Sequence, residues 1–307
     1  MTASARPPRP TLLGQNQYGK AETRVVRVVR DGDTHHIRDL NVSVALSGAM
    51  DEVHLSGSNA NVLTTDTTKN TVYAFAQKYG VTAPEAFAAR LARHFVSSQD
   101  AIGRARIRVE EYAWDRIEGT DGAPVTGHSF VRGGRETRTA EVVHDGSSWQ
   151  VLAGLKDLVV LNSTDSEFWG FAKDPYTTLK ETTDRILATE VHARWRFADG
   201  LPVEGEGAPE WDAVYAEVRG HLLAAFAGTY SLSLQQTLFA MGSRVIEQVP
   251  GIDEVRLSLP NKHHFLVDLE PFGLKNDNEV YFAADRPYGL IEGTVLREGA
   301  TAAIPTD

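Results

Sequence analysis

The residues whose types and spacing best suit chemistry lie in the polar stretch Thr64–Thr71, which reads Thr-Thr-Asp-Thr-Thr-Lys-Asn-Thr. Apolar residues follow it at helical spacing over 72–79, so a helix is expected to begin near Asp66. A Thr or Asp side chain at such a start accepts a backbone N–H that the helix leaves unpaired, and the free amides beside it attract anions. Many helices begin in this way and bind nothing, so the stretch alone leaves a plain helix start and an anion site open.

A second polar stretch, Asn162–Thr183, interrupts a strand-like pattern and contains Phe168-Trp169-Gly170-Phe171. Three aromatic rings around one glycine in a loop could stack on a flat ligand, or they could form a small hydrophobic cluster beneath the loop. Arg185 follows this stretch. Its planar fork suits a flat anion, but it could equally pair with Asp184 or Glu181 at the surface. The residues alone leave these alternatives open.

Both stretches need a scaffold, and the hydrophobic pattern of the first half predicts two strands, two helices and two strands. The turn signal Asp31-Gly32-Asp33 joins the first two strands into a hairpin. Thr82 and Glu85 predict a capping box at the start of the second helix, with Pro84 in its first turn. The expected segments are strands Arg24–Arg30 and Asn41–Leu46, helices after Asp66 and near Thr82, and strands through Ala105–Val109 and Thr137–His144.

The second half repeats this order, which predicts an α+β fold with an antiparallel sheet and helices on one face. Two unrelated tandem domains are the alternative, but duplication is favoured because the order and the segment lengths match. The chain then divides into units 12–146 and 147–299, with tails 1–11 and 300–307. Thr65-Asp66 and Leu234-Gln235 would hold equivalent positions, each opening the first helix of its unit. The expected segments are strands Trp149–Leu161 and Ala193–Phe197, helices Trp211–Leu222 and Leu234–Val245, and strands Val255–Leu259, Phe265–Leu269 and Val280–Phe282.

The composition restricts the function further. The 307 residues are 42% hydrophobic and 23% charged, as in a globular protein with a substantial core, and no run of eighteen apolar residues indicates a membrane span. The net charge of -10 argues against general nucleic-acid binding, and the absence of Cys excludes disulfides, thiolate nucleophiles and Cys-based metal sites. We expect residues 1–11 to be a disordered tail without a signal peptide, and the last residues carry no peroxisomal address, so a cytoplasmic location is expected.

Six motifs in register carry a resemblance to a known family. They are Tyr18-Gly19-Lys20, Thr65–Thr71, His128-Ser129-Phe130, Ser163-Thr164 with Phe168–Phe171, Tyr176 through Arg185-Ile186-Leu187, and Ser258–His263. From about Gln17 to Leu296 the sequence resembles the urate oxidases, or uricases. The resemblance implies the tunnelling fold (T-fold), in which two β-β-α-α-β-β units per chain assemble into a barrel within a homotetramer. It also implies oxidation of urate with dioxygen and water to 5-hydroxyisourate and hydrogen peroxide, without metal or organic cofactor.

The resemblance also implies roles for single residues at a site between subunits. Arg185 and Gln235 would clamp opposite edges of urate, Phe168 would stack on its face, and the backbone N–H groups of Leu234 and Asp66 would bind ring atoms. Asn261 would lie above the ring beside the dioxygen or water site. One subunit would supply Thr65 and Asp66, and its neighbour would supply the residues Phe168, Arg185, Leu234 and Gln235.

Lys20, Thr65 and His263 resemble the proton relay of the family. Urate must lose protons and water must be activated, so a group that takes and returns a proton is needed. A threonine hydroxyl can pass a proton by rotating. Without the resemblance, Lys20 would be read as a surface charge and His263 as a residue at a strand edge. Register favours His263 over His264 as the relay imidazole.

Other functions are weighed against this hypothesis. Two pairs of adjacent histidines occur, His35-His36 and His263-His264. Adjacent residues on a strand point to opposite faces of the sheet, so neither pair can chelate one ion by itself. No His-Glu-x-x-His motif occurs either, so a zinc-dependent T-fold enzyme is disfavoured. A catalytically silent T-fold protein that binds purines or pterins is a first alternative, and a purely structural barrel is a second. The intact relay residues argue against the silent protein.

Overall fold

The computed structural model describes residues 11–306, with the backbone alone for Asp285. Eight long strands form one sheet in chain order, β1-β2-β3-β4-β5-β6-β7-β8, and every neighbouring pair is antiparallel. The two halves therefore share a single sheet, in which β4 pairs with β5. The strands are β1 (Tyr18–Asp31), β2 (Thr34–Gly48), β3 (Ile102–Arg116), β4 (Phe130–His144), β5 (Trp149–Asn162), β6 (Leu187–Phe197), β7 (Ile252–Leu266) and β8 (Tyr281–Leu296).

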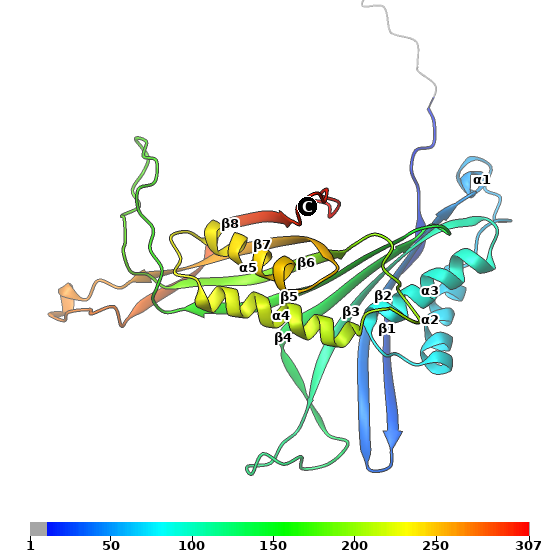
Figure 1. Cartoon of the computed structure of the whole chain (residues 1–307), viewed down its shortest axis with the longest axis horizontal. Helices are drawn as coiled ribbons and strands as arrows, with labels where there is room; N and C mark the ends of the chain where they lie inside the picture. Colours follow the sequence, from blue (N-terminus) through cyan, green and yellow to red (C-terminus); the bar gives the residue numbers. More distant parts are fainter. Residues whose placement is uncertain (1–10, 307) are drawn as a thin grey trace, which may run out of the picture.

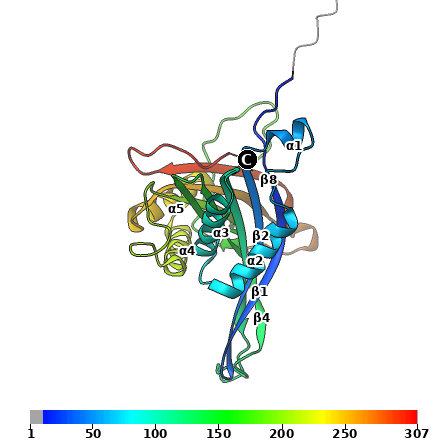
Figure 2. The ribbon, with the colours of Figure 1, turned by 90° about the vertical axis from the view of Figure 1, so that its right-hand side faces the viewer.

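The long helices cover one face of the sheet, two over each half (Figures 1 and 2). They are α2 (Thr65–Tyr79), α3 (Pro84–Ser98), α4 (Trp211–Gly228) and α5 (Leu234–Gln248), with the short α1 (Asp51–Leu55) and the 3-10 turn η1 (Glu270–Phe272) besides. The order β-β-α-α-β-β thus occurs twice, and the predicted α+β fold is confirmed. No helix within residues 11–306 is both long and apolar enough to span a membrane.

The predicted hairpin at Asp31-Gly32-Asp33 is present, because Asp31 pairs with Thr34 and Gly32 takes a positive φ of 56°. The prediction of separate strands at Val255–Leu259 and Phe265–Leu269 is wrong. One strand, β7, contains the first predicted strand and ends at Leu266, two residues into the second. A register shift against β8 between Asn261 and His263 accommodates the irregularity. The polar run between the two predicted strands is therefore part of the sheet. The predicted disordered tail lies, except for Thr11, outside the described residues.

The helix starts bear out one sequence rule and contradict another. Thr64 is the N-cap of α2, and its side chain accepts a hydrogen bond from the N–H of Thr67, as the polar stretch indicated. The predicted capping box of Thr82 and Glu85 is wrong, since α3 begins at Pro84 after an Ala83 N-cap that makes no side-chain bond. Glu85 is 1% exposed and binds Arg138 instead. The side chain of Glu85 thus forms a buried ion pair with Arg138 and does not cap α3.

The predicted equivalence of Thr65-Asp66 and Leu234-Gln235 by order along the chain is also wrong. Thr65 opens α2, the first long helix of its half, whereas Leu234 opens α5, the second helix of its own half. The two helices instead correspond in their places on the sheet. Helix α2 packs on β1 at one edge, and α5 packs on β7 and β8 at the other.

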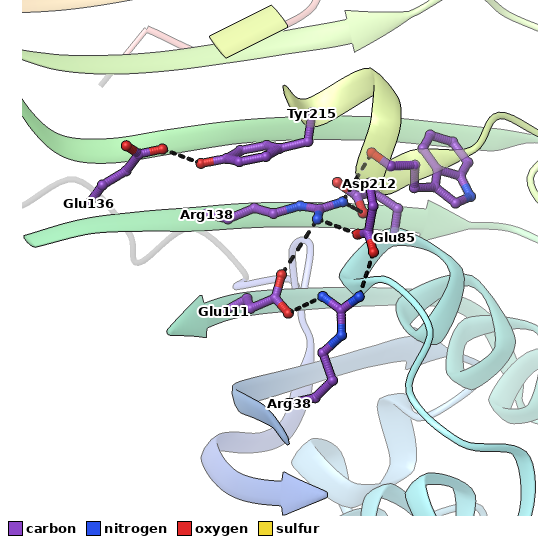
Figure 3. A network of polar contacts seen from close by, with 8 residues as sticks. Arg38, Glu85, Glu111, Glu136, Arg138, Asp212 and Tyr215 are labelled. Atoms are coloured by element: carbon purple, nitrogen blue, oxygen red, sulfur yellow. Dashed lines mark hydrogen bonds and ion pairs between the residues drawn. The ribbon is translucent and has the colours of Figure 1, made fainter. Parts of the chain in front are cut away.

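A buried polar network ties the two halves together beneath the helices (Figure 3). Arg138 on β4 donates hydrogen bonds to Glu85 of α3 and to Asp212 of α4, each at 2.6 Å. Arg38 on β2 joins the network through Glu111 and Asp212. An arginine this buried is stabilised only by such partners, so the network links α3 of the first half to α4 of the second.

Residues 297–306, which follow β8, form no helix or strand but are attached to the sheet. Ile304 is 5% exposed, and its backbone N–H donates to Glu254, which is fully buried. Arg196 donates both to Glu254 and to the carbonyl of Thr301. These bonds hold the end of the chain against β6 and β7.

Candidate active site

A groove of about 800 Å³ opens where the long loop after β5 meets β7 and the start of α5. Six of the nine residues predicted to act on a ligand line this groove. They are Phe168, Arg185, Leu234, Gln235, Asn261 and His263. The structure therefore brings together residues from three separate parts of the chain.

The aromatic loop supports the first wall of the groove. The backbone N–H groups of Phe168 and Thr182 each donate to the carbonyl of the other, which closes the loop into a narrow ladder. The rings of Phe168 and Phe171 are stacked with centroids 5.1 Å apart and planes 15° apart. The ring of Phe168 is thus held in place, and the guanidinium of Arg185 lies 5.1 Å from its centroid.

Arg185 is half-buried, yet no carboxylate within residues 11–306 makes an ion pair with it. The alternative considered above, a surface pair of Arg185 with Asp184 or Glu181, does not form. Thr164 donates to Asp184, and Lys173 pairs with Glu181. Burial lowers the pKa of Arg185 below its ordinary value, although the group remains charged at neutral pH. A charged fork without a counter-ion is therefore available at the groove.

The start of α5 supplies unpaired amides beside this charge. Ser233 is the N-cap and accepts from the N–H of Gln236, while the Gln236 side chain accepts from the N–H of Leu232. Gln236 is thereby used in capping, whereas the Gln235 amide lines the groove. In the described part of the chain, the backbone N–H groups of Leu234 and Gln235 have no acceptor. Such amides suit an anionic or carbonyl-rich ligand.

Strand β7 forms the third wall, with Asn261 and His263 on either side of its register shift. Burial lowers the pKa of His263, and the positive charge of Arg185 lowers it further. His263 is therefore mainly neutral near pH 7 and able to accept a proton. His264 also lines the groove, but its Nδ1 atom lies 3.0 Å from the carbonyl oxygen of Lys262.

The remaining predicted residues form a second cluster at the other edge of the sheet. Lys20 lies on β1, and Thr65 and Asp66 open α2, which packs on β1. The hydrogen bond from Lys69 lowers the pKa of Asp66, and the charge of Lys20 adds to the effect. Strands β1 and β7 are separated by five others, and α2 lies at the opposite end of the molecule from the β7–β8 arm (Figure 1). One chain does not join Lys20 and Thr65 to His263.

Some residues of the groove were not predicted. Tyr281 and Ile291 on β8 line it because they lie opposite Leu266 and Leu259 of β7. Their apolar types indicate a strand, but only the register between strands places them at the groove. Thr178 and Leu179 of the long loop also line it, and no spacing in the sequence marks them.

A cluster on β5 and β6 was also missed. Ligating atoms of Asp157, Glu190 and His192 lie within 4.8 Å of one another, and Asp157 reaches the cluster from a bulge, with a φ of 64°. The Lys262 ammonium lies 3.0 Å from Glu190. Because a cation already neutralises one of the carboxylates, the cluster gives no support for a metal site.

Comparison with known proteins identifies the family. The uricase family model matches residues 16–143 and 151–292. The chain belongs to the uricase family. It is 53% identical to the uricase of Arthrobacter globiformis, covering 99% of this chain and 97% of that protein, and 38% identical to the uricase of Oryctolagus cuniculus, covering 92% and 93%.

The fold comparison agrees with this membership. A crystal structure of the Arthrobacter globiformis uricase superposes with a TM-score of 0.89 at 52% identity, over 97% of this chain and 99% of that one. The resemblance carried by the six motifs is confirmed, and with it the predictions of a T-fold and of an oxidoreductase. Within a uricase, the groove and the second cluster (Lys20, Thr65 and Asp66) are two candidate parts of one active site.

Proposed function

We propose that this protein is a cofactor-independent urate oxidase. Urate, dioxygen and water would give 5-hydroxyisourate and hydrogen peroxide, so that the purine loses two electrons and dioxygen gains them. The observation that carries the proposal is the half-buried Arg185. It has no counter-ion within residues 11–306, and it lies beside a fixed aromatic ring and two backbone amides that lack acceptors in the same range. An anionic, planar and carbonyl-rich ligand such as urate satisfies all three features.

Each group of the groove then has a role in binding. The fork of Arg185 would hold one edge of urate, and the amide of Gln235 would hold the opposite edge. The ring of Phe168 would stack on the purine, and the N–H of Leu234 would bind a ring atom. Asn261 would lie above the purine at the position of dioxygen or water. No metal or organic cofactor takes part in the proposed reaction.

The relay requires a second copy of the chain. Strands β1 and β8 are the two edges of the sheet, and their outer N–H and C=O groups are free to pair with another strand. We propose that the β1 edge of one copy meets the β8 edge of another, within a homotetramer whose sheets close into a barrel. This contact would bring Lys20, Thr65 and the N–H of Asp66 to the groove of the neighbour.

The chemistry of the relay follows from its residue types. His263, mainly neutral, can take a proton, and Lys20 can deliver one or accept one across the hydroxyl of Thr65. Protons lost by urate would thus be held near the site and returned to the reduced dioxygen as peroxide forms. The positive charges of Arg185 and Lys20 would stabilise the anionic intermediates.

The test measures loss of urate absorbance and release of peroxide by protein that has been dialysed against a chelator. We expect turnover to persist at the rate of the untreated protein. A matched variant, Lys20→Met, should lower kcat by about 100-fold or more while xanthine, which lacks the 8-oxo group, binds as before. Loss of turnover with the chelator would contradict the cofactor-free reaction, and equal losses of kcat and xanthine affinity would contradict the relay.

A further inference from the structure

The backbone around Ser166 joins Arg185 to the start of α5. Ser166 forms a parallel bridge with Ser231, in which Ser231 donates its N–H to the carbonyl of Asp165 and the N–H of Glu167 donates to the carbonyl of Ser231. The N–H of Arg185 in turn donates to the carbonyl of Ser166 at 3.0 Å. The loop that carries Arg185 is therefore fastened to the turn before α5.

The side chains of Ser166 and Ser231 are buried, and hydrogen bonds connect Ser231 to α5. Ser166 is 1% exposed, and Ser231 and Thr237 are fully buried. The Thr237 hydroxyl donates to Ser231 Oγ at 2.8 Å, and the Ser231 hydroxyl donates to the carbonyl of Ser233, the N-cap of α5. The same few bonds thus fix the helix amides and the loop carrying Arg185 relative to each other.

The Ser166 hydroxyl contacts the guanidinium of Arg185 directly. Arg185 Nε donates to Ser166 Oγ at 3.0 Å, whereas the two terminal nitrogens of Arg185 bond to nothing within residues 11–306. Because the Nε–H bond lies in the guanidinium plane, this contact fixes the rotation of that plane. The terminal nitrogens are left for a ligand in the groove.

We infer that Ser166 is a positioning residue, whose hydroxyl holds the Arg185 fork in the orientation that binds a planar anion edge-on. This inference deepens the proposed function and rests on it. Without the hydroxyl, the backbone bond still places Arg185 at the groove, but the guanidinium loses the hydrogen bond that fixes its plane. Each binding event must then order the plane again, which weakens binding.

The test compares Ser166→Ala with the wild-type protein and with Thr137→Val. Thr137 is a buried hydroxyl residue on β4 that does not line the groove, so its substitution controls for the loss of a buried polar group. We expect Ser166→Ala to raise the Kd for xanthine and the KM for urate by about 10-fold, with kcat little changed. Thr137→Val should change the melting temperature alone.

A second variant keeps the inference falsifiable if Ser166→Ala does not fold. Ser166→Cys preserves the shape of the side chain but replaces the oxygen with a weak acceptor, and it should raise the same two constants. If Ser166→Ala or Ser166→Cys folds, oxidises urate and binds xanthine as the wild type does, the inference is overturned and the proposed function stands. If the wild type neither binds xanthine nor oxidises urate, the proposed function fails, and the inference fails with it.

Discussion

Two arginines of this molecule, the buried Arg138 and the half-buried Arg185, have opposite surroundings. Arg138, 7% exposed, has its terminal nitrogens within 2.6 Å of Glu85 and of Asp212, and within 3.5 Å of Glu111 (Figure 3). In the described part of the chain, Arg185 contacts a serine hydroxyl and an aromatic ring and no carboxylate. The fold thus surrounds the buried Arg138 with carboxylates, whereas the half-buried Arg185 has no carboxylate partner within residues 11–306.

The difference separates a structural charge from a functional one. A buried ion is stable only with partners, and a partner supplied by the protein leaves no place for a ligand. The terminal nitrogens of Arg138 are paired with carboxylates of the protein, and these bonds join the two halves of the fold. The half-buried charge of Arg185 is expected to lower the stability of the empty protein slightly, and a bound anion is expected to remove this cost. The comparison therefore predicts that the two residues affect different measurements.

The largest expected effect is on stability, through Arg138→Met. The substitution keeps most of the buried stem but leaves Glu85 as an uncompensated carboxylate beneath the helices, so unfolding should become easier by about 3–5 kcal/mol. Denaturant unfolding measures this change. The double variant Arg138→Met/Glu85→Leu serves as control, since it removes both ions and should recover much of the loss. A loss below about 1 kcal/mol for the single variant would mean that the network contributes little.

Arg185→Gln should show the reverse pattern. The substitution removes the charge and the fork, so the Kd for xanthine should rise by about 100-fold, a change of about 2.7 kcal/mol in binding free energy. Stability without ligand should stay the same or rise slightly, because an uncompensated charge is removed. Titration calorimetry and denaturant unfolding give both values on one sample. Unchanged xanthine affinity would contradict the clamp and break the contrast with Arg138.

A smaller effect is expected from Asp212 as the pH falls. Burial would raise the pKa of Asp212, but hydrogen bonds from Arg138 and Arg38 outweigh burial and lower it. A carboxylate with a lowered pKa stabilises the fold above its unfolded pKa, about 3.9, and this contribution disappears as pH falls through the folded value. Because the side chain is half exposed, we expect no more than about 1 kcal/mol.

Unfolding of the wild type and of Asp212→Asn, measured from pH 7 to pH 3, tests this contribution. The wild type should be more stable at pH 7, and the difference should shrink as pH falls below about 3.9, the unfolded pKa, toward the lowered folded pKa. Other carboxylates titrate in both proteins, so only the difference between the two curves is informative. A difference that does not depend on pH would mean that the charge of Asp212 is unimportant.

The same contrast explains what the sequence could predict. Local patterns predicted the Thr64 cap, the hairpin at Gly32 and the repeated element order, because each depends on neighbouring residues. They failed at Glu85, which has the spacing of a capping box but binds Arg138, 53 positions away. A sequence rule that uses spacing over three residues cannot register a partner at that distance.

The candidate site was predictable in part for a related reason. Asn261 and His263 lie in a polar run of β7. The sequence pattern predicted a break between two strands there, but the run is part of one strand and both residues line the groove. Their types were informative about chemistry and misleading about structure. Tyr281 and Ile291 reach the groove only through strand register, which no single segment contains. The motifs therefore indicated which residue types take part, whereas strand pairing in the sheet determines which residues lie together at the groove.

The smallest predicted effect tests whether the charge of Arg185 lowers the pKa of His263, the imidazole of the proposed relay. Burial lowers the pKa of His263 first, and the charges of Arg185 and His264 lower it further, whereas burial alone lowers the pKa of His94. In Arg185→Gln, the pKa of His263 measured by NMR titration should therefore rise toward 6.5 without reaching it, and that of His94 should not change. If both histidines keep their wild-type values, Arg185 and His263 are electrostatically independent, and the clamp would have no part in keeping the relay imidazole neutral. A rise confined to His263 would show that the charge of Arg185 lowers the pKa of this imidazole and so keeps it neutral and able to accept a proton.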